Sequence, residues 1–185
     1  MQGKHSNHPK APTKTKELSV HQALHAAGFV FEYQVHVPFR GCKLDTLTVC
    51  AFVDFMIMAH WGVILLEVDE HQHSAYLPSC DVRRDLDIYT SIALGSRHKA
   101  VILRYNPDSF RVDGTRVALS TKERQKRLLE VLSAWVMEDP APRMQFARFF
   151  LFYDSRSESM LPTVSNQWDK AAHEISAVLP VCRSS

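Results

Sequence analysis

Cysteines, long apolar runs and an apolar leader are scarce or missing in this chain, and each shortage excludes a class of protein. The 185 residues include four cysteines, too few and too widely spaced for a disulfide scaffold. No apolar run approaches the roughly 20 residues that a membrane span needs. The first ten residues are basic and polar, without the apolar core of a secretory signal. The sequence therefore predicts an intracellular protein with free thiols and no membrane partner.

Neither the cysteines nor the net charge identifies a ligand. Cys42, Cys50 and Cys80 could hold Zn²⁺ together with a nearby histidine, but the chain has no CxxC pair, so a structural zinc site is not favoured. The formal net charge is +2, which is too small by itself to indicate a nucleic-acid partner. Any basic surface must then come from an uneven distribution of charge.

Length and composition favour one folded domain. With 45% hydrophobic and 23% charged residues, 185 residues are enough for one compact core and too few for two ordinary domains. Residues 1–14 are rich in lysine, histidine and proline without apolar periodicity, so we expect a flexible tail that can touch DNA phosphates. Residues 15–185 are then one domain, with a core over 15–110 and an extension over 111–185.

Apolar periodicity predicts the order of helices and strands. The capping pair Ser120 and Glu123 marks the start of one helix, and Gly28 is placed to end another. Helices are expected at residues 15–27, 81–94, 121–140 and 166–179, and strands at 29–37, 49–58, 63–69, 99–105 and 144–153. The second and third strands are close enough in sequence to form a hairpin. This order indicates an α/β fold, with α+β as the alternative.

Three acids lie where the two hairpin strands should meet. Because side chains alternate along a strand, Glu67 and Asp69 share one face, and Asp54 comes from the neighbouring strand. Bare charge at the end of apolar strands is costly unless a cation or substrate compensates it. Carboxylates are the hard ligands that Mg²⁺ or Mn²⁺ prefers, and such ions can drive phosphodiester hydrolysis. The alternative is ordinary acids at exposed strand ends.

A histidine, an acid and two arginines follow this cluster. His73 can exchange a proton near neutral pH, with His71 the weaker candidate. Asp81 either orients His73, helps to hold metal, or is an ordinary acid of a helix's first turn. Arg83 and Arg84 have fork-shaped donors for DNA phosphate, with pairing to Asp87 as the alternative.

Two further groups are weaker candidates. Glu17 lies on the first predicted helix, where Lys14 and Lys16 beside it are candidate DNA contacts and a solvated acid is the alternative. The later helix begins with a basic group that is better explained as a solvated helix face than as phosphate contacts, namely Lys122, Arg124, Lys126 and Arg127.

Four segments in order, VDF at 53–55, LLEVDEHQH at 65–73, DVRRDL at 81–86 and VILRYNPD at 101–108, resemble the PD-(D/E)XK nuclease superfamily. The likeness covers residues 15–110. Within that superfamily it is greatest to the branch that contains very-short-patch-repair endonucleases and homing endonucleases with a histidine in the site. The resemblance does not extend to the last 75 residues.

The resemblance implies a restriction-endonuclease-like mixed sheet flanked by helices and metal-dependent cleavage of DNA. Asp54 matches the first motif acid and Glu67 the second, both metal ligands, and Glu17 matches the first-helix acid. Asp69 stands where the superfamily has lysine, and Val53 where it has proline. The first departure points either to the histidine-using branch, completed by His73 and Asp81, or to an inactive fold.

The leading hypothesis is a Mg²⁺-dependent endonuclease acting on double-stranded DNA in homing, mobile-element or repair processes. Asp54, Glu67 and Asp69 would hold metal, His73 would act on water or phosphate, and Asp81 would support it. One alternative is a nucleic-acid-binding module that has lost cleavage, and another is a protein-interaction domain. The sequence leaves a homodimer open.

Overall fold

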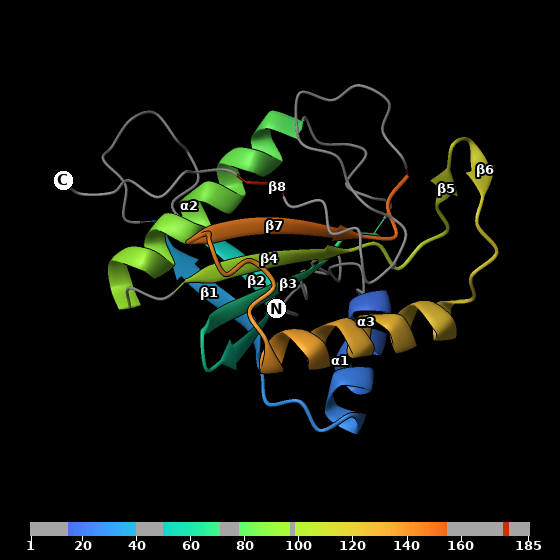
Figure 1. The fold of residues 1–185 in the computed structure, drawn as a ribbon, viewed down its shortest axis with the longest axis horizontal. Coiled ribbons are helices and arrows are strands. Elements are labelled where there is room, and N and C mark those ends of the chain that lie inside the picture. The colour runs from blue at the N-terminus through green and yellow to red at the C-terminus, as the bar shows by residue number, and fades with distance from the viewer. Residues whose placement is uncertain (1–14, 40–49, 71–77, 97–98, 155–175, 178–185) are drawn as a thin grey trace, which may run out of the picture.

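A mixed β-sheet with helices on both faces forms the centre of the computed structural model (Figure 1). The structure describes residues 15–39, 50–70, 78–96, 99–154 and 176–177. The sheet has the strand order β1-β2-β3-β4-β7-β8, with the bounds Glu32–Pro38, Cys50–Ala59, Gly62–Val68, Ala100–Tyr105, Phe146–Leu151 and Ser176–Ala177. The helices are α1 (Thr15–Ala26), α2 (Pro78–Ser96) and α3 (Thr121–Met137). This is an α/β fold.

Strand direction changes in the middle of the sheet. The first three strands form an antiparallel meander, whereas β3, β4 and β7 run parallel to one another. Parallel neighbours need a crossover connection, and α2 provides it between β3 and β4, while α3 provides it between β4 and β7. The predicted hairpin is confirmed, with Ala59 paired to Gly62.

Two apolar layers hold the helices on opposite faces of the sheet (Figure 1). Val20 of α1 and Leu128 of α3 pack with Leu66 on one face. Ile88 of α2 packs with Leu65 on the other. Because β3 is covered on both faces, all seven of its residues are buried. Polar side chains on this strand therefore need partners inside the protein.

Local signals in the sequence placed two helix ends correctly. Ser120 and Glu123 form the predicted capping box, in which Glu123 N–H donates to Ser120 Oγ at 3.2 Å and Ser120 N–H donates to Glu123 Oε2 at 2.8 Å. Gly28 adopts φ 78° just after α1, a left-handed conformation that glycine accepts without steric cost. Both predictions are confirmed.

Two local features differ from the sequence prediction. Ser176–Ala177 form β8, which pairs antiparallel to β7, so the predicted helix is wrong at these residues because the edge of β7 offers them backbone partners. The rest of 166–179 lies outside the described residues. A short hairpin of β5 (Arg111–Val112) and β6 (Thr115–Arg116) was not predicted.

The described helices include none that is both long and apolar enough to span a membrane. Cys50 is a free thiol, as expected. Cys42 and Cys182, like the side chain of Cys80, lie outside what the structure describes, so the prediction about them stays open.

Gly62 is expected to tolerate no side chain. A Cβ atom there would overlap the backbone carbonyl oxygen of Lys99, which also accepts the Val63 N–H at 2.9 Å. Gly62→Ala should lower the free energy of unfolding by about 1–3 kcal/mol, as overpacking does elsewhere. Urea titration followed by circular dichroism measures the change.

Gly95→Ala is the matched control for this prediction. Gly95 lies in α2 with no heavy atom within 4 Å of its would-be Cβ, so alanine should raise stability by up to about 1 kcal/mol through helix propensity. Equal effects of the two substitutions would contradict the close contact at Gly62.

Candidate functional site

Asp54 lies at a local distortion of strands β1 and β2. The pairing of Tyr33 with Phe55 and Val35 with Val53 places Gln34 across from Asp54. Gln34 has φ 52°, a left-handed conformation that is rare for non-glycine residues and that costs about 1–3 kcal/mol where it is forced. Such strained residues cluster at functional sites.

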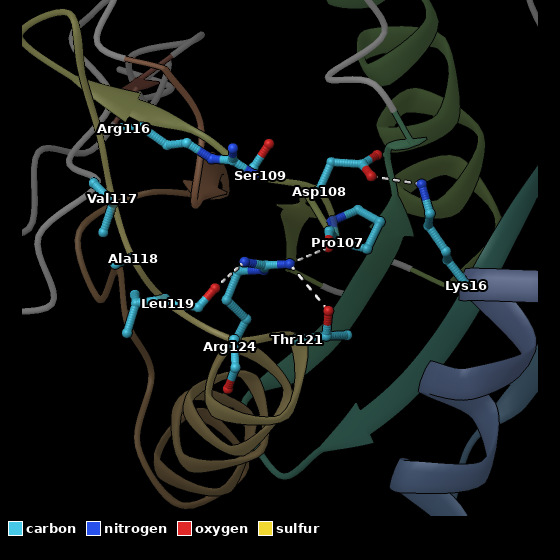
Figure 2. A pocket seen from close by; sticks show the side chains of 11 residues that line it. Lys16, Pro107, Asp108, Ser109, Arg116, Val117, Ala118, Leu119, Thr121 and Arg124 are labelled. Carbon is cyan, nitrogen blue, oxygen red and sulfur yellow. Dashed lines mark hydrogen bonds and ion pairs between the residues drawn. The ribbon is translucent and has the colours of Figure 1, made fainter.

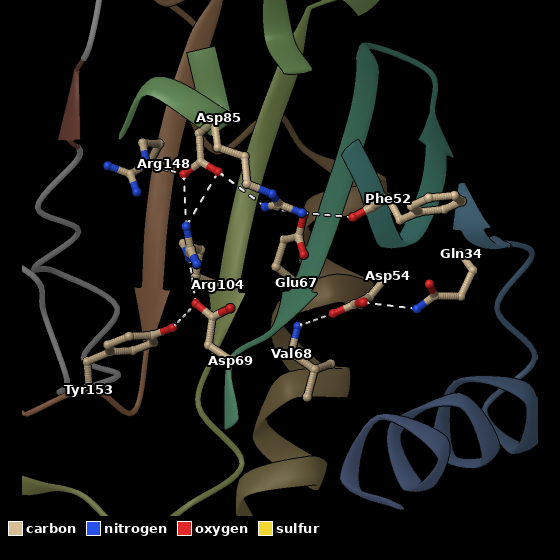
Figure 3. A network of polar contacts seen from close by, with 11 residues as sticks. Gln34, Phe52, Asp54, Glu67, Val68, Asp69, Asp85, Arg104, Arg148 and Tyr153 are labelled. Carbon is tan, nitrogen blue, oxygen red and sulfur yellow. Dashed lines mark hydrogen bonds and ion pairs between the residues drawn. The ribbon is translucent and has the colours of Figure 1, made fainter. Parts of the chain in front are cut away.

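The side chain of Asp54 replaces a backbone partner at this point. The regular β2–β3 pairing ends at Phe55 and Leu66, and Asp54 Oδ2 then accepts the Val68 N–H at 2.8 Å. Asp54 is 6% exposed. The carboxylate is thus held rigidly between two strands (Figure 3).

Glu17 joins Asp54 through one amide group. It is 2% exposed in the first turn of α1 and accepts hydrogen bonds from Tyr33 Oη at 2.8 Å and from Gln34 Nε2. The same Gln34 nitrogen donates to Asp54 Oδ1 at 3.1 Å. A single donor therefore lies between two buried carboxylates, and the alternative of a solvated acid at position 17 is wrong.

Glu67 is a buried acid with an unusual proton affinity. Burial raises its pKa to about 8, and the Asp54 and Asp69 charges add to this effect, whereas Arg84 and Arg104 oppose it. Arg84 Nη1 donates to Glu67 Oε1 at 3.0 Å, and Arg84 Nη2 donates to the Phe52 carbonyl at 2.8 Å. Arg84, one of the two predicted phosphate contacts, thus faces Glu67 within the site.

The pKa of Glu67 predicts how stability depends on pH in chelator. Between about 4.5 and about 8 the folded protein keeps a proton that the unfolded chain releases, so the free energy of unfolding falls as pH rises through this window. The slope from one such group is at most about 1.4 kcal/mol per pH unit. Glu67→Gln removes this titration, so the variant should match wild type near pH 4.5 and exceed its stability near pH 8.

Urea titrations at four pH values, in chelator, measure this difference. Glu130→Gln is the control, because Glu130 is exposed on α3 and its substitution should shift stability little at any pH. A constant gap between wild type and Glu67→Gln across the range would contradict a raised pKa.

Asp69 points into a second group of charges beneath α2. It is 1% exposed, accepts from Arg104 Nε at 2.5 Å and also accepts the Tyr153 hydroxyl. Burial raises the pKa of Tyr153, and the neighbouring Asp69 charge raises it further. Asp69, which was expected to share a metal with Asp54 and Glu67, therefore already has Arg104 of β4 and Tyr153 after β7 as partners. Its role as a metal ligand stays a prediction.

Asp85 of α2 completes this buried network (Figure 3). Its Oδ2 lies 3.2 Å from Arg104 Nη1 and 2.7 Å from Arg148 Nε. Asp85 is fully buried, and the two arginine side chains are 1–2% exposed. One helix carboxylate thus holds two guanidinium groups from adjacent parallel strands.

The remaining predicted residues are dispersed. Arg83 is exposed and lies 4.0 Å from Asp87, which is the alternative pairing that the sequence allowed. Lys16 contacts Asp108 at 2.5 Å and Glu70 at 4.0 Å. His71, His73, Lys14 and the side chain of Asp81 lie outside what the structure describes.

The solvated-face interpretation of the basic start of α3 is wrong for Arg124. This side chain is 5% exposed, and its Nη2 donates to the Pro107 carbonyl at 2.7 Å and to Thr121 Oγ1 at 3.2 Å. Lys126 is exposed and 3.8 Å from Glu130, as a solvated face requires. Arg124, in the first turn of α3, therefore points into the protein, whereas Lys126 in the next turn faces solvent.

Sequence reasoning missed several residues that shape the site. Gln34, Arg104 and Arg148 each interrupt a β-prone segment with a polar side chain. A long charged side chain inside an otherwise apolar strand signals a buried partner. That signal was available for Arg104 and Arg148, whereas Gln34 and Tyr153 are uncharged and do not carry it.

The carboxylates of this site could bind a divalent cation that takes only one or two ligands from the protein. Within the residues the structure describes, no group of three or more His, Cys, Asp or Glu side chains forms a ready metal cluster. Mg²⁺ commonly takes one or two carboxylates and completes its shell with water and substrate phosphate. Asp54 and Glu67 fit that requirement, because the charge of Asp54 adds to the cost of ionising the buried Glu67.

These features define an α/β protein with a buried carboxylate site at a distorted strand. No protein-family model matches the chain, and no curated protein does. A crystal structure described as "Protein of Unknown Function AF1548" is similar at 11% sequence identity and a TM-score of 0.33. The match covers 62% of this chain and 53% of that one.

Proposed function

We propose that this protein is a metal-dependent DNA endonuclease that hydrolyses phosphodiester bonds, with Asp54 and Glu67 holding Mg²⁺ or Mn²⁺. The observation that carries the proposal is the burial of these two acids beside each other, at 6% and 4% exposure. An acid whose pKa is raised to about 8 by burial and by a second acid is destabilised when ionised. A bound cation would remove that penalty.

The order of elements supports the same proposal. The structure places α1, the β1–β2–β3 meander, α2 and the parallel strand β4 along residues 15–105. This is the stretch whose motifs resemble PD-(D/E)XK nucleases, and a mixed sheet flanked by helices is what that resemblance implies. We therefore propose a restriction-endonuclease-like arrangement for this part of the chain.

The chain's own residues would orient the site and its substrate. A bound Mg²⁺ supplies activation of water and neutralisation of charge on the phosphate. The Val68 N–H fixes Asp54, and Arg84 fixes Glu67 while its side chain stays 30% exposed. Arg84 is thus placed to donate to a phosphate oxygen as well. Glu17 and Gln34 support Asp54 from α1 and β1.

A nucleic-acid-binding module without cleavage is the second candidate. Two ion pairs favour it, because arginines already compensate two of the acids. Arg84 pairs with Glu67 in β3, and Arg104 pairs with Asp69 just after β3. The lysine that activates water in the superfamily is also replaced by Asp69. Such a protein would bind double-stranded DNA through its basic side chains.

Incubation of supercoiled plasmid with the full-length protein in Mg²⁺, in Mn²⁺ and in chelator separates these candidates. Nicked or linear product that depends on metal supports the endonuclease. DNA binding in chelator without cleavage in any lane supports the binding module. Absence of both binding and cleavage on several DNA substrates would contradict both candidates.

A further inference from the structure

A cavity of about 710 Å³ lies outside the carboxylate site (Figure 2). Its walls come from the first turn of α1, the loop after β4, the β5–β6 hairpin with the segment after it, and the start of α3. Figure 2 shows Arg116, Arg124 and Lys16 extending from three of these segments around it. The proposed cleavage reaction uses none of these three side chains.

The charge of the cavity wall is positive. Three basic side chains and a single acidic one, Asp108, line it. Lys16 Nζ lies 2.5 Å from Asp108 Oδ1, so that carboxylate is already compensated. Arg116 is exposed. The described lining side chains therefore carry two more positive than negative charges.

Arg124 is the buried member of this wall. It is 5% exposed, and its guanidinium donates to the Leu119 and Pro107 carbonyls and to the Thr121 hydroxyl. The buried Tyr105 hydroxyl is a further neutral group beside the guanidinium. All of these acceptors are neutral. A buried cation held only by neutral oxygens is costly unless an anion approaches it.

Other groups in the wall also suit an anion. Ser109 and Thr121 bring hydroxyl groups to the cavity, whereas the Ser120 hydroxyl already donates to the Glu123 carboxylate at 2.7 Å. The 17-residue helix α3 begins here, so the positive end of its dipole faces the same region. Arginine forks, hydroxyls and a helix start together match the acceptor oxygens of a phosphate group.

We propose that this cavity binds a phosphate group, and that the phosphate belongs to the DNA strand on which the carboxylate site acts. This inference rests on the proposed function. Lys16 lines the cavity, while its neighbour Glu17 hydrogen-bonds within the carboxylate site. One turn of α1 therefore joins the two sites, and a strand with one phosphate at the acids can place another at Arg116 and Arg124.

Fluorescence anisotropy with a labelled DNA duplex, in chelator to prevent cleavage, tests the proposal over a series of salt concentrations. Arg116→Gln should weaken binding about tenfold at low salt and reduce the slope of log K against log salt by about one. Arg143→Gln is the control, because Arg143 is also exposed but does not line the cavity. Identical affinities and slopes for the two variants would overturn the inference while leaving DNA binding in place.

Inorganic phosphate provides a second arm that identifies the source of the ligand. Phosphate should raise the melting temperature of wild type and of Arg143→Gln above a chloride control of equal ionic strength, but not that of Arg116→Gln. If this shift occurs while DNA affinity is unaffected by Arg116→Gln, a free phosphate compound is the ligand and the DNA source is wrong. Absence of DNA binding by wild type would overturn the proposed function itself. If phosphate also failed to change the melting temperature of wild type, the cavity would not be a phosphate site.

Discussion

Asp54→Asn is expected to reduce metal-dependent cleavage of plasmid DNA at least about 100-fold while the protein stays folded. Asparagine is neutral, so the substitution weakens binding of the cation at this position. The charge stabilisation that the cation provides to the reaction falls with it. The asparagine carbonyl can still accept the Val68 N–H that Asp54 accepts at 2.8 Å, so the connection between β2 and β3 survives. Initial rates of nicking at saturating Mg²⁺ measure the effect.

Asp87→Asn is the matched control for this experiment. Asp87 is an acid on α2 that is 41% exposed and 4.0 Å from Arg83, so its substitution should change the rate less than twofold. Circular dichroism and melting temperature establish that both variants are folded. Cleavage by Asp54→Asn at the wild-type rate would exclude Asp54 as a metal ligand, and with it the proposed site.

Asp85→Asn is expected to cause the largest loss of stability. Asp85 is fully buried and lies within 3.2 Å of two guanidinium groups, those of Arg104 and Arg148. Neutralising the carboxylate leaves two buried positive charges with less compensation, and breaking a buried ion pair in this way typically costs about 3–5 kcal/mol. For a chain of this length that loss lowers the melting temperature by roughly 10–15 °C.

Asp87→Asn again is the control, two residues away on the same helix. Its contact with Arg83 is exposed, so its loss should change stability by about 0.5 kcal/mol or less. Urea titration of the three proteins measures both effects. If Asp85→Asn were as stable as Asp87→Asn, the two arginines would have other compensation, and the buried network would contribute nothing measurable.

Most of the sheet could be predicted because its signals are local. The apolar run from Val63 to Val68 is the pattern of a strand buried on both faces, and β3 has that environment. Ser120 with Glu123, and Gly28 after α1, mark helix ends through contacts that span a few residues. The edge strand β8 was missed because its conformation depends on pairing with β7, which is distant in sequence.

The carboxylate site was only partly predictable. Strand alternation placed Glu67 and Asp69 on one face of the strand predicted at 63–69, and the hairpin brought Asp54 beside that strand. Alternation does not say which side chain from another element meets each acid. In the structure Glu67 accepts a hydrogen bond from Arg84, whereas Asp69 accepts from Arg104 and Tyr153. The two neighbouring acids therefore have different partners.

The sequence by itself determined the order of the main helices and strands, their capping residues and the acids of the second and third strands, because those features depend on side-chain period and on contacts within a few residues. Only the tertiary structure decided that Gln34 joins Glu17 to Asp54 and that Asp85 holds two arginines. It also decided that Arg124 lies buried at a cavity. Such contacts join residues that are distant along the chain, and burial then sets the energy of each charge.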